Sequence, residues 1–252
     1  MAPAAGYGVS EDAAVRLRRD FIDLELSLYN TDSYLTRKSI LDALRAALPH
    51  IHGTVLDVGC GRSPYRPILL APPSRGTNYV GMDFVNPQYT TRPDIEWQGG
   101  PIALPDGAVD SAIATEVLEH SSDPWALARE VHRVLGPDGF FFLTVPFLWP
   151  LHDVPHDHFR YTPFSLERLL RDAGFNHVEV RALGGWDASL ATMLGLWVQR
   201  RPLGDPWLGL LRRVVLRVYK RLLAADRPPE RFDSSVMITG LTASAWKRAK
   251  NE

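Results

Sequence analysis

The sequence has 252 residues, with 28 Lys and Arg against 29 Asp and Glu, which gives a formal net charge of −1 at pH 7. This balance excludes a chain-wide basic field, so nucleic-acid binding is not expected outside a local patch. A hydrophobic fraction of 45% excludes a disordered or fibrous protein and is typical of a globular one. Cys60 is the only cysteine, which excludes an intrachain disulfide and fits a cytoplasmic location.

The predicted elements begin with helices. Apolar residues recur at helical spacing from Ser10 onward, between Val15 and Leu28, and a second helix is predicted over residues 35–48, before Pro49. Together they predict an N-terminal helical cap over residues 1–49. The first residues have no basic segment followed by an apolar one, so we expect no secretory signal. No apolar stretch approaches the roughly 20 residues of a membrane-spanning helix, so we expect no transmembrane segment.

From residue 54 the pattern changes to short apolar strands that alternate with helices. Four strands are predicted, at residues 54–58, 78–83, 109–114 and 140–145. The helix between the last two has Asp123 at its N-cap and Gly136 beyond its end, and another helix runs from Thr162 to Gly174. This alternation predicts a doubly wound, parallel α/β sheet.

The last part of the sequence departs from the alternation. Two more strands are predicted, at 177–183 and 236–241, and a helical, Arg-rich insertion at about 186–232 separates them. Residues 200–231 carry a net charge of +6, with most cations expected opposite an apolar stripe. That stripe comprises Trp207, Leu208, Leu211, Val214, Val215, Val218 and Leu222. It predicts a helix packed on the sheet edge or on a second subunit of a homodimer, a peripheral membrane contact, or a cover over an anionic acceptor.

A glycine turn follows the first strand. Gly59 and Gly61 allow a sharp turn and close approach of a ligand, and Pro64 is expected in the first turn of the next helix. Asp83 ends the second strand and is placed to accept both hydroxyls of a ribose. Asp57 would repel a dinucleotide pyrophosphate but attract an ammonium and a sulfonium. The turn therefore favours S-adenosylmethionine (SAM) over a nicotinamide dinucleotide.

Four motifs within residues 50–185 resemble those of the class I SAM-dependent methyltransferases. They are VLDVGCG, YVGMDF, LPDGAVDSAIATEVLEH and HRVLGPDGFFFLTVP, in the family's order and spacing. The resemblance implies an α/β, Rossmann-like, doubly wound and mostly parallel seven-stranded sheet with an antiparallel last strand, in a domain over residues 50–252. It also implies an enzyme with SAM as cofactor.

The resemblance further implies the residues of the cofactor site. They are Asp57, Gly59, Cys60, Gly61, Asp83, Ile102 and Glu116. Asp57 and the glycines would line the methionine portion, and Asp83 would bind the ribose. Ile102 and nearby backbone would contact the adenine, and Glu116 would close the pocket. The third glycine that the family usually has in this turn is replaced by Ser63-Pro64.

Acids and histidines gather in two loops that follow strands. Glu116, Glu119 and His120 have the spacing i, i+3, i+4, so a helical turn would place all three on one face. The second group comprises His152, Asp153, His156, Asp157 and His158. Such groups suit a divalent ion. The alternative interpretation is structural: TEVLEH is a plain helix start, and HDHFRYT is a hydrogen-bonded loop.

Small-RNA 2′-O-methyltransferases and ubiquinone-pathway O-methyltransferases carry a similar Glu-x-x-Glu-His run that contains metal ligands. This resemblance implies Mg²⁺ as a further cofactor, which would lower the pKa of an acceptor hydroxyl while His152 or His156 acts as general base. The implied ligands are Glu116, Glu119, His120 and either His156 or His158.

The predicted function is O-methylation of a hydroxyl on a small-molecule or oligosaccharide acceptor, namely a saccharide or similar polyol. Phe147, Trp149 and Trp186 are candidates for a platform under a sugar ring, or equally for the core. Bacterial relatives with a loop like PHDHFRYT are often linked to glycan modification, which favours this acceptor by resemblance. The alternatives are a quinol or natural-product methyltransferase, an RNA 2′-O-methyltransferase, and a catalytically silent SAM-binding or scaffold protein.

Overall fold

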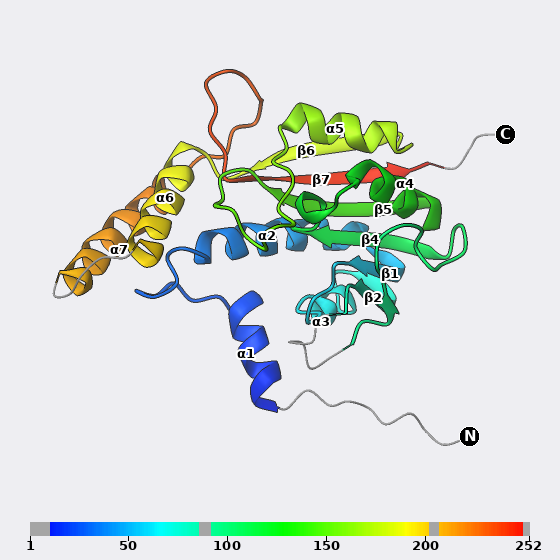
Figure 1. Cartoon of the computed structure of the whole chain (residues 1–252), viewed down its shortest axis with the longest axis horizontal. Coiled ribbons are helices and arrows are strands. Elements are labelled where there is room, and N and C mark those ends of the chain that lie inside the picture. Colours follow the sequence, from blue (N-terminus) through cyan, green and yellow to red (C-terminus); the bar gives the residue numbers. More distant parts are fainter. Residues whose placement is uncertain (1–10, 86–91, 202–206, 249–252) are drawn as a thin grey trace.

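The alternating apolar segments fold into one sheet that helices cover on both faces (Figure 1). The computed structural model describes residues 11–85, 92–201 and 207–248. Within these residues the sheet has seven strands in the order β3-β2-β1-β4-β5-β7-β6. The strands are β1 (His52–Val58), β2 (Arg75–Asp83), β3 (Ile95–Glu96), β4 (Val109–Thr115), β5 (Leu135–Pro146), β6 (His177–Leu183) and β7 (Gly240–Lys247).

The strand directions follow the prediction. Strands β1 to β5 pair in parallel, and β7 lies antiparallel between β5 and β6. The Rossmann-like, doubly wound and mostly parallel sheet with an antiparallel last strand is therefore confirmed. Because the first five strands are parallel, their carboxyl ends meet at one edge, where ligands bind in such sheets.

Helices pack on the sheet because successive residues of its buried strands point to opposite faces. The helices are α1 (Glu11–Phe21), α2 (Tyr34–Ala47), α3 (Arg66–Leu69), α4 (Pro124–Val134), α5 (Pro163–Asp172), α6 (Trp186–Arg200) and α7 (Leu208–Ala225), with 3-10 turns at Leu48–His50 and Leu118–His120. Phe140 and Phe142 pack with Leu44 of α2. Phe141, from the same strand, packs on the other face with Leu166 of α5.

The predicted starts of α4 and α5 are confirmed by their caps. Asp123 accepts a hydrogen bond from the backbone N–H of Ala126 at 2.9 Å, and Thr162 forms a reciprocal capping box with Ser165. Gly174 follows Ala173, the C-cap of α5, and has φ +107°, as a left-handed helix end requires.

The predicted last strand is misplaced. The prediction put it at 236–241, but β7 begins at Gly240 and continues to Lys247. The buried side chains of β7 are mostly small and alternate with Thr242 and Ser244, so the apolar run before the strand gave the stronger signal. Leu241, Ala243 and Ala245 are fully buried between β5 and β6.

The first helix is shorter than the apolar spacing predicts, and its predicted start at Ser10 lies outside the described residues. It ends at Phe21. Beyond it, the Asn30 side chain accepts from the Ser27 N–H and donates to the Glu25 carbonyl, both at 2.8 Å. These bonds hold the chain in turns, because a short amide side chain competes with helical backbone bonds.

The helix after the glycine turn also differs from the prediction. It has only the four residues of α3, Arg66–Leu69, and Pro64 lies before the helix instead of in its first turn. The space over the turn is therefore bordered by α1 and α2, which come from the N-terminal part of the chain.

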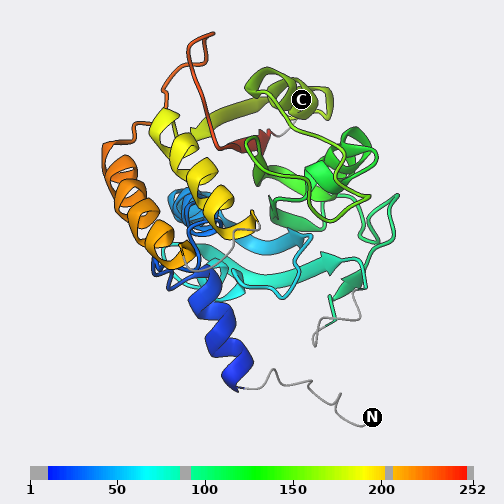
Figure 2. The ribbon, with the colours of Figure 1, turned by 60° about the vertical axis from the view of Figure 1, so that its left-hand side comes forward.

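The insertion forms α6 and α7, which pack against each other at one end of the sheet (Figure 2). The predicted single stripe on α7 is wrong in part. Val215 and Tyr219 face inward, whereas Trp207, Val214 and Val218 are exposed. The apolar arc of this helix is wider than the face it buries, which the spacing alone could not show. Among the described helices, none has the length and apolar character needed to cross a bilayer.

Candidate functional site

The glycine turn after β1 is built around two left-handed residues. Gly59 has φ +67°, and a Cβ there would lie 2.5 Å from a methyl carbon of Val117. Gly61 has φ +54°, but a Cβ there would meet no described atom within 4 Å. Met82 holds the turn by accepting bonds from the N–H groups of Gly59 and Cys60 at 2.8 and 3.1 Å. Gly59 is thus needed for packing, while Gly61 faces open space that a ligand can enter.

Two carboxylates flank this turn. Asp57, buried near the end of β1, accepts a hydrogen bond of 2.6 Å from the Tyr79 hydroxyl. Burial raises the pKa of Asp57 to about 7; the Tyr79 hydrogen bond limits this rise, and the negative charge of Asp83 adds to it. Asp83 ends β2 and accepts N–H bonds from Gly61 at 2.6 Å and Phe84 at 2.7 Å. Burial also raises the pKa of Asp83.

Two cavities meet at the turn, and both are lined by Gly59, Gly61 and Glu116. The larger, of about 710 Å³, extends from Asp83 and Trp97 to the histidine-rich loop. The smaller, of about 420 Å³, is lined by Asp57, Cys60, Arg37, Tyr65 and residues of α1. Together the two cavities, which share these three lining residues, form the candidate site at the carboxyl ends of the strands.

The structure places most, but not all, of the predicted cofactor residues at the two cavities. Six of the seven line one or both cavities. Ile102 lines neither: it is buried in the core, and its N–H donates to Glu130 at 2.8 Å. The exposed ring of Phe84 lies 5.3 Å from the ring of Trp97 at the cavity wall. Sequence reasoning missed this pair, although Phe84 directly follows the predicted ribose-binding acid.

Arg37 and Tyr65 were also missed, because they come from segments before and after the turn. Arg37 on α2 donates to the Asp20 carbonyl at 3.1 Å and stacks over the ring of Phe21 at 4.8 Å. It brings a cation to the smaller cavity, close to the turn. No sequence motif marks this arginine, since its position depends on the packing of α1 against α2.

The i, i+3, i+4 spacing predicted that Glu116 shares a helical face with Glu119 and His120. The structure does not have this helical turn. Glu116 has φ +55°, and only Leu118–His120 forms a 3-10 turn. A non-glycine residue in this conformation is strained, and such strain is often found at functional sites. Burial raises the pKa of Glu116 to about 7.

Glu119 is a fully buried carboxyl group, and neither of its oxygens has a hydrogen-bond partner among the described residues. Its Oε1 lies 3.7 Å from Nε2 of His120. Burial, followed by the negative charge of Glu116, raises the pKa of Glu119 well above its usual value. Burying a carboxyl group without a hydrogen-bond partner costs free energy of folding, so the position of Glu119 indicates a site for a cation or another ligand.

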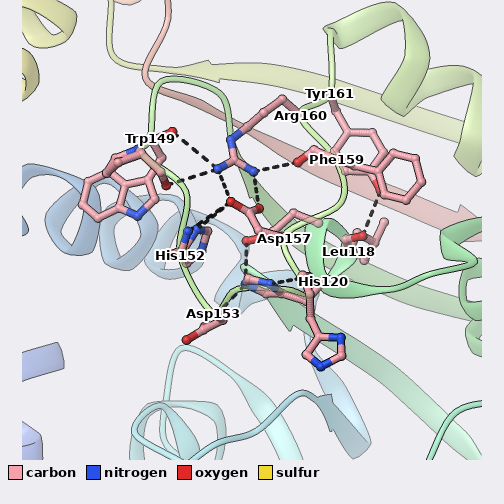
Figure 3. A network of polar contacts seen from close by, with 12 residues as sticks. Leu118, His120, Trp149, His152, Asp153, Asp157, Phe159, Arg160 and Tyr161 are labelled. Atoms are coloured by element: carbon pink, nitrogen blue, oxygen red, sulfur yellow. Dashed lines mark hydrogen bonds and ion pairs between the residues drawn. The ribbon is translucent and has the colours of Figure 1, made fainter.

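His120 and His152 lie beside this acid with their rings 4.6 Å apart (Figure 3). Nδ1 of His120 is 3.1 Å from the His156 carbonyl, which fixes the proton there and leaves Nε2 with a free lone pair. Burial lowers the pKa of His120, so its ring is neutral near pH 7. Nδ1 of His152 lies 3.3 Å from Oδ2 of Asp157.

Asp157 and Arg160 organise the loop after β5, which carries His152 (Figure 3). The Arg160 guanidinium binds both oxygens of Asp157 and donates to the carbonyls of Phe159, Trp149 and Pro150. These charge-assisted bonds hold the pKa of Asp157 well below its usual range, so the group is anionic. The loop therefore has a rigid, charged centre behind His152.

Of the predicted metal ligands, the structure brings Glu119 and His120 together with His152, their ligand atoms within 4.8 Å of one another. Sequence reasoning had given His152 the role of a base. Glu116, His156 and His158 lie outside this group, although all three line the larger cavity. His156 and His158 are exposed, with their rings 6.2 Å apart.

Comparisons with known proteins agree with this geometry. A family model described as methyltransferase domain matches residues 32–180. An uncharacterized methyltransferase of Mycobacterium sp. (strain JLS) is 28% identical over 194 residues, which cover 68% of this chain and 76% of that protein.

Two solved structures have the same fold at low identity. A SAM-dependent methyltransferase from Thermotoga maritima is 14% identical with a TM-score of 0.53, over 92% of this chain and 99% of that one. The phosphoethanolamine N-methyltransferase 2 of Haemonchus contortus, in complex with SAM, is 13% identical with a TM-score of 0.52, over 84% of this chain and 53% of that one. The prediction of an enzyme is confirmed: the chain belongs to the methyltransferase domain family and is a SAM-dependent methyltransferase.

Proposed function

We propose that the enzyme methylates a hydroxyl oxygen of a saccharide or similar polyol. The observation that carries this proposal is the cavity wall on the loop side of the glycine turn, where His120, His156 and His158 lie with Asp153. A hydroxyl must lose its proton as its oxygen becomes a nucleophile, and a neutral imidazole accepts protons near pH 7. These side chains also offer the hydrogen bonds that a polyol can share.

The two cavities suit the two ends of SAM. Arg37 and Asp57 line the smaller cavity. There the Arg37 guanidinium would bind the carboxylate of the methionine portion, and the Asp57 carboxylate would bind its ammonium group. In the larger cavity, Asp83 would accept the ribose hydroxyls, and Phe84 and Trp97 would pack on the adenine. The sulfonium then lies near Glu116, which lines both cavities and favours positive charge.

In this arrangement His156 is the proposed general base. Its side chain is exposed and lines the larger cavity, whereas His152 is engaged with Asp157 behind His120. The acceptor oxygen attacks the methyl carbon in line with the breaking carbon–sulfur bond, and S-adenosylhomocysteine leaves with the sulfur electron pair. His156 takes the hydroxyl proton, so the oxygen carries no positive charge in the product.

The group of Glu119, His120 and His152 fits a divalent cation. Glu119 brings a buried carboxylate without a hydrogen-bond partner. Nδ1 of His120 lies beside the His156 carbonyl, which leaves its Nε2 available as a ligand atom. Nδ1 of His152 is buried 3.3 Å from Oδ2 of Asp157 and has no hydrogen-bond partner among the described residues. Such outer partners orient metal-binding histidines in many proteins. Bound there, a divalent cation would lower the pKa of a coordinated acceptor hydroxyl.

The donor set also bears on which cation would bind. Sequence analysis proposed Mg²⁺, which prefers oxygen ligands in octahedral geometry. Two imidazoles and one carboxylate suit a transition metal such as Mn²⁺ or Zn²⁺ better. We therefore include both, beside Mg²⁺, in the experiment that tests the proposal.

The experiment measures transfer of a labelled methyl group from SAM to a panel of saccharides, polyols, quinols, amines and RNA. We expect labelled methyl ethers of saccharides or polyols, and a large loss of turnover for His156→Ala with SAM affinity retained. His177→Ala, which changes an exposed histidine on β6, is the matched control and keeps full activity. Labelled product only from amines, quinols or RNA would refute the proposed acceptor.

The role of the metal is tested on the same assay. The protein is stripped with a chelator and then supplied with Mn²⁺, Zn²⁺ or Mg²⁺. We expect one of these ions to restore turnover in the wild type but not in Glu119→Gln. If the stripped enzyme is as active as the untreated enzyme, the metal proposal is wrong, while the acceptor and the base remain open to the first experiment.

A further inference from the structure

Helix α7 has an exposed apolar stripe that the methyl-transfer site does not use. Its members are Trp207, just before the helix, and Leu210, Val214 and Val218. Between 38% and 72% of each of these residues is exposed. The last three follow one another at intervals of four residues, so they form one line along the helix.

Cations accompany this stripe along its length. Arg213, Arg217 and Arg221 each lie three residues after a stripe residue and are therefore its neighbours on the helix surface. All three are exposed, as is Lys220. Helix α7 contains no Asp or Glu, and none of these four cations has an acidic partner within hydrogen-bond or ion-pair distance among the described residues.

The neighbouring helix also has exposed apolar residues. Helix α6 packs side by side with α7 (Figure 2) and leaves its own line of large apolar residues exposed. That line consists of Trp186, Leu190, Met193 and Trp197. Exposed apolar residues clustered in this way on two adjacent helices mark an interaction surface, whereas single ones do not.

We infer that the exposed face of α7 docks on the surface of an anionic lipid bilayer. An apolar stripe with tryptophan at one end and cations beside it is the pattern of a helix that lies in the plane of a membrane interface. The apolar side chains enter the boundary of the acyl chains, and the cations bind lipid phosphates. This inference does not depend on which acceptor the enzyme methylates.

Charge favours lipid over a second copy of this chain. In a symmetric dimer through this face, the same patch would meet itself. Two helices with five cations each and no acid would then lie against each other, which like-charge repulsion opposes. An anionic bilayer instead supplies the missing negative charge across the whole face.

The test is flotation of the full chain with vesicles of phosphatidylcholine alone, and of phosphatidylcholine and phosphatidylglycerol in equal parts. We expect binding to the anionic vesicles only, weakened by high salt. The triple variant Arg213→Gln, Arg217→Gln, Arg221→Gln should lower the partition coefficient on the order of 100-fold, since each cation near an anionic surface contributes about fivefold. Leu210→Ser with Val214→Ser should lower it about tenfold.

Matched controls come from α5, at a different part of the surface. Phe164→Ser removes an apolar side chain that is more exposed than Leu210 or Val214, and Arg168→Gln removes an exposed cation. Both should bind anionic vesicles as the wild type does, and all variants should keep the thermal unfolding midpoint of the wild type. Equal binding of the α7 variants and the wild type would overturn the inference. So would a dimer that forms without lipid and is lost in Leu210→Ser.

Discussion

The Arg160 guanidinium binds both carboxylate oxygens of Asp157, with nitrogen–oxygen distances of 2.5 and 2.8 Å. Only 2% of the Asp157 side chain and 25% of the Arg160 side chain is exposed, so water screens this pair less than it screens a surface pair. We expect Asp157→Asn to lower the free energy of unfolding by roughly 3 kcal/mol, because the Arg160 charge loses its partner. Urea unfolding near neutral pH measures this change.

A surface ion pair on α5 provides the comparison. Arg171 and Glu167 lie 2.8 Å apart but are about half exposed, so Glu167→Gln should cost less than about 1 kcal/mol. Because Arg160 lowers the pKa of Asp157, the buried pair stabilises the fold above about pH 4 and loses this contribution as the pH falls below that value. Equal costs for the two substitutions would show that the loop is not held by the buried pair.

Asp57 should make the ligand-free protein less stable as the pH rises. Burial raises its pKa to about 7 in the folded state, whereas an unfolded chain has the ordinary value near 4. Between these two values the folded state binds more protons, so the free energy of unfolding falls with rising pH. Asp57 alone should lower the free energy of unfolding by on the order of 4 kcal/mol across this pH range.

The measurement is thermal or urea unfolding from pH 5 to pH 8. Asp57→Asn removes one of the titrating carboxyls and should make the profile shallower, while Glu116 and Glu119, whose pKa values burial also raises, keep part of the slope. Tyr79→Phe removes the hydrogen bond that lowers the pKa of Asp57, so its free energy of unfolding should continue to fall to a higher pH than that of the wild type. If Asp57→Asn has the same slope as the wild type, this carboxyl is not the source of the pH dependence.

Much of the fold could be predicted because it depends on local signals. The apolar run that contains Phe140 and Phe142 marks a buried strand, and Asp123 and Thr162 mark helix starts that the structure confirms. The strand β7 was misplaced because its buried face consists largely of small residues such as Ala243 and Ala245, which give little hydrophobic contrast.

The candidate site was predicted only where it depends on sequence neighbours. Gly59 and Gly61 identify the turn because their conformations favour glycine. The group of Glu119, His120 and His152 could not be predicted, because a positive φ at Glu116 breaks the expected helical turn and the long-range loop fold brings in His152.

A divalent cation should stabilise the protein through Glu119 and His152. A ligand that binds only the folded state raises the free energy of unfolding by about 2.7 kcal/mol at 100 times its dissociation constant. We expect added Mn²⁺ or Zn²⁺ to raise the unfolding midpoint of the wild type but not of His152→Ala. His158→Ala, outside the group, should keep the shift. A shift of the same size in all three proteins would place the cation elsewhere.

The two glycines of the turn should respond differently to alanine. Both have positive φ, so each substitution costs about 1 kcal/mol of backbone strain. Gly59→Ala also drives a Cβ against Val117, so its unfolding free energy should fall by a further 1 kcal/mol or more, on the order of the cost of overpacking. The Cβ of Gly61→Ala meets no described atom, so this variant should be nearly as stable as the wild type. It should bind SAM at least tenfold more weakly than the wild type. Calorimetric titration with SAM tests this, and unchanged affinity would show that Gly61 does not border the cofactor.

Gly195 and Gly209 form a pair of helix glycines with opposite expected effects. A Cβ on Gly195 of α6 would lie 2.0 Å from the Thr31 carbonyl oxygen, where α6 packs on the N-terminal segment. Gly195→Ala should therefore lower the free energy of unfolding by roughly 1–3 kcal/mol, because backbone must move. Gly209 in α7 has no described atom within 4 Å of such a Cβ, so Gly209→Ala should raise it by up to about 1 kcal/mol through helix propensity. Urea unfolding of both variants measures these changes. A Gly209→Ala variant less stable than the wild type would contradict the open space beside α7. A Gly195→Ala variant as stable as the wild type would contradict the close packing of α6.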